Sequence, residues 1–471
     1  MKALHSEPFH IQAKHMLRYA GKRLLRSEIP LSHHHFQSAL RQQYFQPINP
    51  FKKSLFRTTC NRCGNQKQSL LGTIPCKRCN REHKYCRKCI QMGRVLECEP
   101  LYEWIGPEPV RTKWMNPLAW EGTLTSLQEE ASHQVIETVQ GKQREILVWA
   151  VCGAGKTELL FSGIAQALQL GQRICIATPR ADVVRELLPR FQKAFPHVSV
   201  EGLYGGSSEK SGHSQLILAT THQLLRFHQA FDCMVIDEVD AFPYHHDPML
   251  PYVVSRAVKS THALIYLTAT PRQDLIKRVV SRELPVQFIP RRFHGYPLPV
   301  PQLTLSPTLA KTLKQKQTPN AFEKWLQTRN HPQRQLLIFV PTISLLHDLE
   351  APIRALLLSL GVITQPNAFQ TVHADDATRE EKVLHFRRGD IQVLLTTTIL
   401  ERGVTFPSID VFIIDAGHTV FDEAALIQIA GRAGRSKTDP DGEVIYLHTG
   451  KTRAMILAVR SIKKMNQKGG F

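Results

Sequence analysis

The 471-residue sequence has no apolar run that approaches the roughly 18 residues needed to cross a lipid bilayer. Its first residues, MKALHSEPFHIQAK, also lack the apolar core of a secretory signal. A content of 42% hydrophobic and 21% charged residues is typical of a globular chain and excludes a wholly disordered one. We therefore expect a cytoplasmic protein that is long enough for two or three domains.

Acidic residues are scarce in the first quarter of the chain. Residues 1–113 contain 21 Lys and Arg, seven Glu and no Asp, so they carry +14 of the net charge of +20. A charge of this sign favours a polyanionic partner, either nucleic acid or an anionic membrane surface. The rest of the chain is nearly balanced, which indicates a basic front end joined to a different kind of body.

Cysteine is scarce in most of the chain but not in residues 60–89, where three Cys-x-x-Cys pairs occur in thirty residues. One cysteine-rich segment in a large chain favours metal binding in a reducing compartment over a disulfide framework. The pairs at the two ends resemble zinc knuckles, which predicts one tetrahedral Zn²⁺ in a ribbon. Its expected ligands are Cys60, Cys63, Cys86 and Cys89.

The middle pair leaves an alternative open. Cys76 and Cys79 could replace the second knuckle, or form a further site with Cys86, Cys89 or His83. The Lys and Arg residues between the knuckles favour contact with phosphates, and a solvated basic face is the alternative.

Short apolar runs separated by helix-length amphipathic stretches make up most of the body. They are ILVWAV (146–151), RICIAT (173–178), QLILATT (215–221), CMVIDE (233–238), ALIYLTAT (263–270), QLLIFVPT (335–342), FQTVHA (369–374), IQVLLTTT (391–398), VFIIDAG (411–417) and GEVIYLH (442–448). Such runs are typical of buried parallel strands with crossover helices, and predict the α/β class. Four prolines in residues 291–307 exclude a helix there and predict a linker.

Residues 150–158, AVCGAGKTE, have the form of a phosphate-binding loop between a strand and a helix. In such a loop Lys156 contacts the β- and γ-phosphates and Thr157 binds Mg²⁺. Ala150 stands where the full pattern has glycine, a mild departure because that position needs only a small residue. The backbone donors would come from Gly153, Ala154 and Gly155.

A second motif, VIDEVDAF at residues 235–242, places two carboxylates after an apolar strand. Asp237 is expected to hold Mg²⁺, usually through water, and Glu238 to polarise the attacking water. Two such acids alone are often a solvated turn. Their position about eighty residues after Lys156 favours a nucleotide site instead.

These motifs, together with LTSLQ (124–128), LTATP (267–271), TTTILERGVTFP (396–407) and QIAGRAGR (428–435), resemble those of the superfamily 2 helicases and translocases over residues 120–450. The resemblance implies two RecA-like domains in tandem and a nucleic-acid-stimulated ATPase that uses ATP and Mg²⁺. It implies that Gln128 reads adenine and that Gly403 contacts the nucleotide. Together with the cysteine pairs and the proline-rich break, it divides the chain into a basic segment without an assigned role (1–55), a zinc-finger module (56–113), an ATP-binding domain (114–295), a linker (296–307) and a C-terminal domain (308–471).

Arg432 and Arg435 lie three residues apart at an expected helix start. From there both guanidinium groups could reach a γ-phosphate held by the other domain, so we expect them to be arginine fingers.

The strand-contact motifs of the same superfamily resemble TPR (178–180) and TTH (220–222), with counterparts near 371–373 and 396–398. Contacts of this kind hold phosphates without reading bases, so weak sequence preference is expected for single-stranded DNA, with RNA as an open alternative. The residues concerned are Pro179, Arg180, Thr220, Thr221, His373 and Thr397.

The order of CNRCG, YCRKCIQMGRVLECEPLYEW (85–104), DEVDAFPY (237–244) and the later motifs resembles the ComFA family of competence proteins. This resemblance implies a motor at the cytoplasmic face of the membrane that draws single-stranded DNA through the channel ComEC. It also implies ComFC and DprA as partners, and the chain could form a homo-oligomer. Two alternatives remain, a replication-restart helicase of the primosomal kind and a zinc and nucleic-acid binding scaffold without enzymatic activity.

Overall fold

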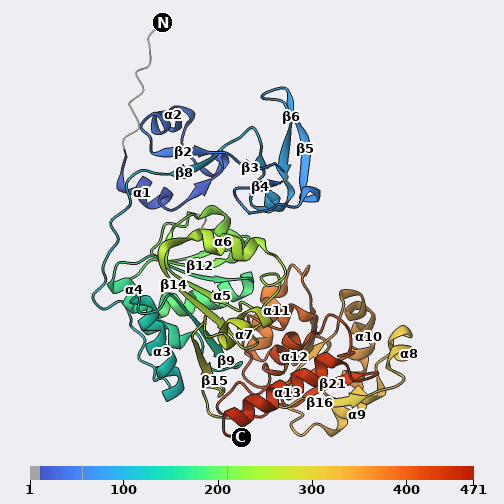
Figure 1. Ribbon diagram of the computed structural model, residues 1–471. Helices are drawn as coiled ribbons and strands as arrows, with labels where there is room; N and C mark the ends of the chain where they lie inside the picture. Colours follow the sequence, from blue (N-terminus) through green and yellow to red (C-terminus); the bar gives the residue numbers. More distant parts are fainter. Residues whose placement is uncertain (1–10, 56, 209–210) are drawn as a thin grey trace. The chain divides into compact units, whose positions relative to one another are not determined.

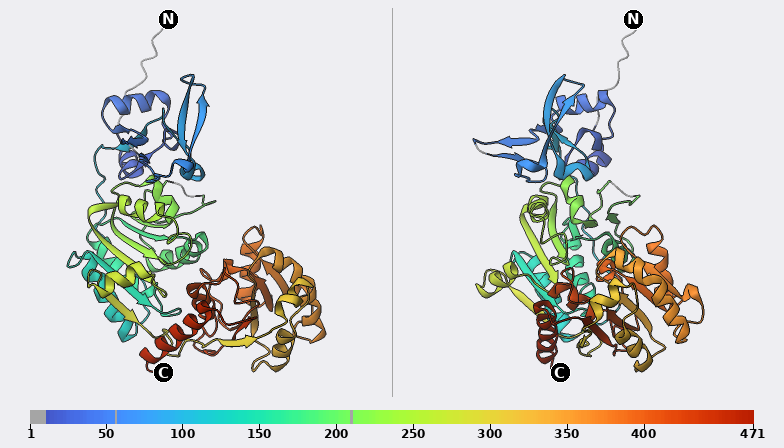
Figure 2. Two further views of the ribbon diagram at one scale, coloured as in Figure 1. Left: turned by 45° about the vertical axis from the view of Figure 1, so that its right-hand side comes forward. Right: turned by 90° about the vertical axis from the view of Figure 1, so that its right-hand side faces the viewer.

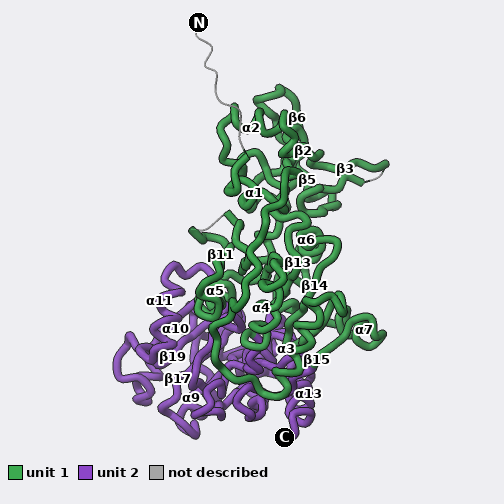
Figure 3. The backbone as a smooth tube through the Cα atoms, turned by 90° about the vertical axis from the view of Figure 1, so that its left-hand side faces the viewer, with its two compact units in different colours: residues 1–148, 157–287 green, residues 149–156, 288–471 purple. Residues whose placement is uncertain are grey.

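The computed structural model describes residues 11–55, 57–208 and 211–471, and its described residues fall into two compact units (Figures 1 and 3). Unit 1 comprises the described parts of residues 1–148 and 157–287, and unit 2 comprises residues 149–156 and 288–471. No described helix has both the length and the apolar character that crossing a membrane requires.

The N-terminal part of unit 1 contains small sheets and short helices. Helices α1 (Ala13–Tyr19) and α2 (His33–Arg41) accompany a sheet with the order β1-β8-β2, formed by Arg23–Leu24, Leu101–Trp104 and Phe45–Ile48. Its core is aromatic, with the rings of Tyr19 and Phe45 5.2 Å apart. Residues from the expected basic segment therefore share a sheet with residues that follow the cysteines.

The cysteine module, residues 58–98, has little core of its own. Strand β4 (Thr58–Cys60) pairs with β3 (Phe51–Lys53), and a second sheet has the order β5-β6-β7 (Leu71–Cys76, Arg81–Cys86 and Val95–Leu96). The short helices η2 (Gln68–Leu70) and η3 (Arg87–Met92) connect these strands. In Figure 2, β5 and β6 form a narrow ribbon whose turn projects outward.

A seven-stranded sheet with the order β11-β12-β10-β13-β14-β9-β15 forms the rest of unit 1 and continues into residues grouped with unit 2. In sequence order its strands are β9 (Glu145–Ala150), β10 (Ile174–Thr178), β11 (Val200–Leu203), β12 (Leu216–Thr220), β13 (Phe231–Asp237), β14 (Val258–Thr268) and β15 (Val286–Ile289). The helices are α3 (Ser126–Val139), α4 (Phe161–Gln169), α5 (Ala181–Ala194), α6 (Met249–Ala257) and α7 (Gln273–Val280), with the 3₁₀ turns η4 (Glu158–Leu160) and η5 (Thr221–Arg226). Strands β10 to β14 pair in parallel, and their buried residues form an apolar layer.

Unit 2 contains a six-stranded parallel sheet with the order β16-β21-β20-β17-β19-β18. The strands are β16 (Gln302–Leu305), β17 (Gln335–Phe339), β18 (Phe369–Val372), β19 (Val393–Thr396), β20 (Ile409–Ile413) and β21 (Val444–His448). The helices are α8 (Leu309–Lys314), α9 (Asn320–Thr328), α10 (Ile343–Ser359), α11 (Arg379–Arg388), α12 (Glu423–Ala430) and α13 (Arg453–Lys468), with the 3₁₀ turns η6 (Pro366–Ala368) and η7 (Thr398–Leu400). The α/β class expected from the sequence is confirmed, and each apolar run named above overlaps a strand.

Candidate nucleotide and nucleic-acid sites

The phosphate-binding motif forms a tight loop after β9. Gly153 and Gly155 have φ of 81° and 70°, a left-handed conformation that a Cβ would strain. Lys156 Nζ donates to the carbonyl oxygen of Ala150 at 3.4 Å, and Thr157 precedes η4 without making a capping hydrogen bond. The loop therefore presents one ammonium group and one hydroxyl group next to backbone N–H groups, which suits a polyphosphate.

The two carboxylates of the second motif differ in their surroundings. Asp237 ends β13, and its Oδ1 accepts the backbone N–H of Glu238 at 2.9 Å. Glu238 has a positive φ of 54°, and its buried Oε2 has no hydrogen-bond partner among the described residues. Strain and an unsatisfied acceptor at one residue are typical of a site arranged for a ligand or a water molecule.

Asp240, which the sequence analysis did not single out, links this motif to LTATP. The hydroxyl groups of Thr268 and Thr270 each donate to its fully buried carboxylate at 2.5 Å. The backbone N–H of Thr270 donates in turn to Thr268 Oγ1 at 2.9 Å. Bonds to a buried carboxylate are strong, so the two motifs are expected to move together.

Gln128, the expected adenine reader, lies in the first turn of α3 and is buried. Its Oε1 accepts the backbone N–H of Thr125 at 2.8 Å, and Thr125 Oγ1 accepts the N–H of Gln128 at 3.4 Å. This capping box gives Gln128 a structural role at the start of the helix.

Arg432 and Arg435 do not lie at a helix start, and that expectation is wrong. Helix α12 ends at Ala430, so both arginines follow its C-terminal end, because the apolar residues of the motif belong to the helix. Arg432 is buried and its Nε donates to the carbonyl oxygen of Glu401 at 3.1 Å. Arg435 donates to the carbonyl oxygen of Gly431 at 2.9 Å.

Within unit 2, the phosphate-binding loop contacts the segment that carries these arginines. The thiol of Cys152 donates to Gln428 Oε1 at 3.0 Å, and both side chains are buried. A Cβ at Gly431 would lie 2.5 Å from Cys152 Cβ, closer than packed carbon atoms approach. Glycine at 431 therefore permits the close approach.

Arg292 holds the arginine segment from the other side. It is buried, and its guanidinium donates to the carbonyl oxygens of Ala433, at 2.7 Å, and of Gly434. Burial lowers the pKa of Arg292 to about 10. The backbone N–H of Phe293 also donates to the carbonyl oxygen of Gly153 at 2.9 Å. Arg292 was missed as a functional residue because it lies in the segment, residues 291–307, that the sequence predicts only as a linker.

The expected strand-contact residues of unit 1 lie at the carboxyl ends of two neighbouring strands. Thr178 of β10 and Thr220 of β12 are directly opposite each other in the parallel register. Pro179 and Arg180 follow β10, and Thr221 begins η5. The buried hydroxyl groups of Thr178 and Thr221 have no hydrogen-bond partner among the described residues.

Unit 2 repeats this arrangement. Val372 of β18 pairs with Thr396 of β19, so His373 and Thr397 follow two adjacent strands at one edge of the sheet. The buried Nδ1 of His373 has no hydrogen-bond partner among the described residues. Gly403, the expected nucleotide contact, has a positive φ of 81° in the loop after η7.

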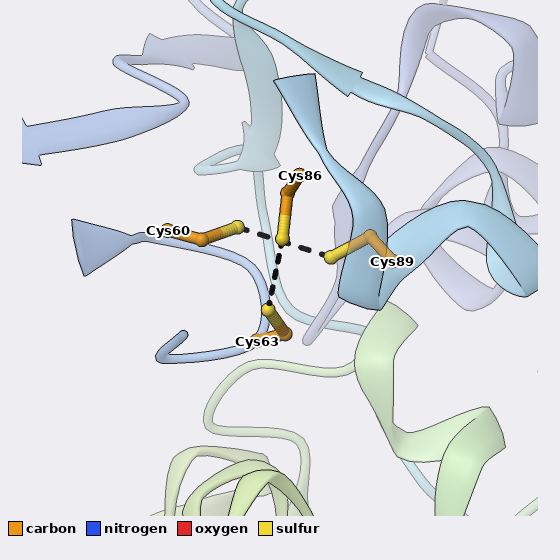
Figure 4. Close-up of side chains that lie close together, drawn as sticks. All are labelled: Cys60, Cys63, Cys86 and Cys89. Atoms are coloured by element: carbon orange, nitrogen blue, oxygen red, sulfur yellow. Dashed lines mark hydrogen bonds between the residues drawn. The ribbon is translucent and has the colours of Figure 1, made fainter. Parts of the chain in front are cut away.

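Four sulfur atoms of the cysteine module point toward one another (Figure 4). The four-cysteine cluster consists of Cys60, Cys63, Cys86 and Cys89, all of them buried, with sulfur atoms within 4.8 Å of one another. Separations of 3.8 Å for Cys60–Cys89 and 3.6 Å for Cys63–Cys86 match the roughly 3.8 Å edge of a zinc–thiolate tetrahedron. Hydrogen bonding, above all with Cys60, lowers the pKa of Cys86 and raises that of Cys89. The cluster could therefore hold zinc once its thiols are deprotonated.

One buried arginine of α6 connects this cluster to η5. Arg256 of α6 donates to the carbonyl oxygens of Asn61, at 3.3 Å, and of Arg62, both between the first two cysteines. The same guanidinium donates to the carbonyl oxygens of Leu224 and Leu225 in η5, at 3.3 and 2.7 Å. Burial lowers the pKa of Arg256 to about 10.

Glu28 also connects the Asn61–Arg62 loop to η5. It binds Arg62 at 2.7 Å and Arg226 of η5 at 3.4 Å. The loop that carries two cluster cysteines is therefore anchored on a segment that begins with an expected strand-contact residue.

A cavity of about 320 Å³ lies beside this junction within unit 1. Basic and apolar residues of the cysteine module face residues of η5 and of the start of α6 across it, and Lys88 forms an ion pair with Asp247 at 2.6 Å. Its lining residues are Leu70, Arg87, Lys88, Ile90, Gln91, Met92, His222, Leu225, Asp247 and Met249.

Comparison with known families matches three parts of the chain. Residues 9–103 match the ComFA N-terminal domain, residues 121–273 the res subunit of type III restriction enzymes, and residues 317–437 the conserved C-terminal domain of helicases. The two helicase domains imply the use of ATP and Mg²⁺ by a superfamily 2 helicase-like ATPase.

Curated relatives match almost the whole chain. Competence protein ComFA of Bacillus subtilis is 42% identical over 95% of this chain and 94% of its own length. ComFA of Streptococcus pneumoniae is 37% identical over 85% of this chain and 92% of its own length. Among solved structures, Dbp5 of S. cerevisiae bound to RNA and ADP BeF3 matches with a TM-score of 0.54 at 18% identity, covering 73% of this chain and 88% of that one, which shows the two-domain RecA-like fold.

Proposed function

Because the chain belongs to the ComFA family of competence proteins, we propose that it is an ATP-driven motor that moves along single-stranded DNA during DNA uptake. Membership of the family shows a competence-related helicase-like ATPase. The substrate, single-stranded DNA, and the movement along it are the proposed part. Nucleotide binding would close the two helicase domains, and loss of the γ-phosphate would release them, so that strand-binding surfaces shift.

The observation that carries the proposal is the pair of hydrogen bonds from Thr268 and Thr270 to Asp240. Asp240 lies two residues after Glu238, the expected water-polarising residue, and the threonines belong to the motif that resembles the coupling element of the superfamily. A rearrangement at the γ-phosphate would reach Thr270 through a buried, charged hydrogen-bond network.

The proposed strand contacts use groups that are suited to phosphates. Arg180 and the threonine hydroxyl groups at the ends of β10 and β12 would bind the DNA backbone in unit 1. His373 and Thr397 would do so in unit 2. In this assignment Lys156, Thr157 and Asp237 handle ATP and Mg²⁺, and Arg432 and Arg435 act as arginine fingers.

The Lys and Arg residues between the cysteines of the cysteine module would bind the single-stranded DNA before it reaches the helicase domains. Attachment at the inner face of the membrane, homo-oligomer formation and assembly with ComEC, ComFC and DprA belong to the same proposal and follow from the family resemblance.

ATP hydrolysis by the purified full chain tests the substrate class. The rate is measured with no nucleic acid, with single-stranded DNA, with duplex DNA and with RNA, and the Lys156→Ala variant serves as the inactive control. The expected result is selective stimulation by single-stranded DNA. Equal or greater stimulation by RNA would contradict DNA uptake, and hydrolysis that persists in Lys156→Ala would contradict the assigned loop.

A further inference from the structure

A second group of sulfur atoms lies in the cysteine module, at the far end of the β5–β6 ribbon. The three-cysteine cluster consists of Cys76, Cys79 and Cys98, whose sulfur atoms lie within 4.8 Å of one another. Cys76 ends β5, Cys79 lies in the turn, and Cys98 comes from the segment after β7. Three thiols from two chain segments thus meet where no packing of apolar side chains requires them.

The geometry of this cluster is that of a metal knuckle. The thiols of Cys98 and Cys76 are 3.7 Å apart, which matches the roughly 3.8 Å separation of two thiolates on one zinc ion.

His83 of β6 supplies a fourth donor next to the cluster. Its Nε2 lies 2.9 Å from Cys79 Sγ, and its Nδ1 lies 3.9 Å from Glu97 Oε2. A carboxylate on the other ring nitrogen is the usual support of a metal-binding histidine. Glu97 is itself held by Lys53 at 2.6 Å and by the backbone N–H of Lys84 at 3.0 Å. Sulfur and imidazole nitrogen on one zinc are about 3.5 Å apart, and His83 is not in the group of ligand atoms that lie within 4.8 Å of one another. The side chains of His83 and of the exposed Cys79 must therefore turn for the imidazole to join the three sulfur atoms.

The ribbon has few other means of holding its shape. Each of its two strands has a single buried residue, and the basic residues Lys77 and Arg78 of the turn and Arg81 of β6 are exposed. A small segment without an apolar core is commonly stabilised by a metal instead. A metal at the turn would fasten the ribbon to the segment after β7 and fix the position of these basic residues.

We propose that Cys76, Cys79 and Cys98, with His83 Nε2 as the fourth ligand, bind a second Zn²⁺, so that the protein carries two structural zinc ions. Binding at this site releases the thiol protons and leaves a closed Cys₃His tetrahedron with no open coordination position. The assignment does not depend on the proposed DNA motor activity.

Zinc content of the full chain provides the first test. Protein purified without chelators is exchanged into metal-free buffer, and zinc is measured by mass spectrometry against protein concentration. The expected values are about two zinc ions per chain for the wild type and about one for Cys79→Ser and Cys98→Ser. Glu82→Ser is the matched control, because Glu82 is exposed on the same ribbon outside the cluster, and it should keep both ions.

Cobalt substitution identifies the ligands and distinguishes the loss of one metal site from misfolding of the whole cysteine module. The sulfur-to-cobalt charge-transfer absorption arises from seven thiolate bonds in the proposed wild type, so Cys98→Ser should lose about three sevenths of it while the four-cysteine signal stays. His83→Ala should weaken metal binding at one site by roughly 10- to 100-fold, and His83→Cys should restore it with a stronger absorption.

Three results would overturn the proposal. The first is a wild-type chain that holds one zinc ion, including the case in which Cys76 and Cys98 are joined in a disulfide. The second is a Cys98→Ser protein that retains two ions. The third, unchanged affinity in His83→Ala, would remove His83 from the ligand set.

Discussion

At the scale of single residues, Glu238 and Asp240 of the VIDEVDAF motif lie in different surroundings and are suited to different roles. The carboxylate of Glu238 has a buried oxygen without a hydrogen-bond partner among the described residues, whereas that of Asp240 accepts two short hydrogen bonds. Glu238 is therefore suited to act on a water molecule or ion, and Asp240 to bind the LTATP motif.

Replacing Glu238 by Gln should lower the rate of ATP hydrolysis by roughly 10²- to 10⁴-fold, because the amide cannot accept the proton of the attacking water. Nucleotide affinity should change little, since the phosphate-binding loop is intact. Steady-state kinetics and binding of a fluorescent ATP analogue measure the two effects. A variant that hydrolyses ATP at the wild-type rate would contradict the role of Glu238.

Thr270→Val should reduce the stimulation of hydrolysis by single-stranded DNA about tenfold and the basal rate less. The change removes one hydrogen bond from the buried carboxylate of Asp240. Thr270→Ser, which keeps the hydroxyl group, should restore stimulation. Equal losses of basal and stimulated rates would indicate a purely structural role.

Lys156, Thr157 and Asp237 could be proposed as nucleotide and Mg²⁺ ligands from the sequence, because they follow strands in a fixed order, and these roles stay predictions. Asp240, Arg292 and Arg256 could not, because their importance depends on partners far away in the sequence. Cys98 was missed as a metal ligand for a similar reason. It has no second cysteine at knuckle spacing, and only the fold brings it to Cys76.

At the scale of structural elements, the four-cysteine cluster and η5 form one junction. Five hydrogen bonds of Arg256 hold carbonyl oxygens of the Asn61–Arg62 loop, of η5 and of Phe227. The cysteine module is therefore expected to stabilise the segment that begins with Thr220 and Thr221.

Arg256→Gln should destabilise unit 1 by at least about 3 kcal/mol, since several buried carbonyl groups lose their donor. It should also lower affinity for single-stranded DNA more than affinity for ATP. Urea unfolding and binding titrations test both effects. Lys259→Gln is the control, because its ion pair with Asp232 is partly exposed and worth no more than about 1 kcal/mol. Similar effects of both substitutions would contradict the proposed role of Arg256 in joining the four-cysteine cluster to η5.

Strands were the elements that the sequence predicted best, since buried parallel strands are short, almost uninterrupted apolar runs. Three were missed. β11 contains Glu201 and Gly202, β15 has only partial burial, and β16 follows three prolines in the segment interpreted as a linker. Edge strands such as these bury less and leave a weaker pattern.

At the scale of the whole molecule, charge separates the basic front of the chain from the nearly neutral helicase core. The front end carries +14 of the total charge of +20, and its ribbon and cavity expose lysine and arginine. Domain class and charge distribution could both be predicted from the sequence. The boundaries of the five expected segments stay predictions.

Affinity for single-stranded DNA should fall steeply with salt, because each neutralised phosphate releases counterions and contributes a slope of about −0.7 in log–log form. Replacing Lys77, Arg78 and Arg81 together by Ala should reduce the slope by roughly 1 to 2. Fluorescence anisotropy at several salt concentrations measures it. A flat salt response would mean that the basic charge serves another purpose.

Displacement of streptavidin from biotinylated single-stranded DNA tests the central claim most directly, because it detects movement along one strand without requiring a duplex to be unwound. Oligonucleotides with biotin at the 5′ or the 3′ end are compared, with Glu238→Gln as the control. The account predicts ATP-dependent displacement from one end only, absent in Glu238→Gln. DNA-stimulated hydrolysis without displacement from either end would contradict a translocating motor.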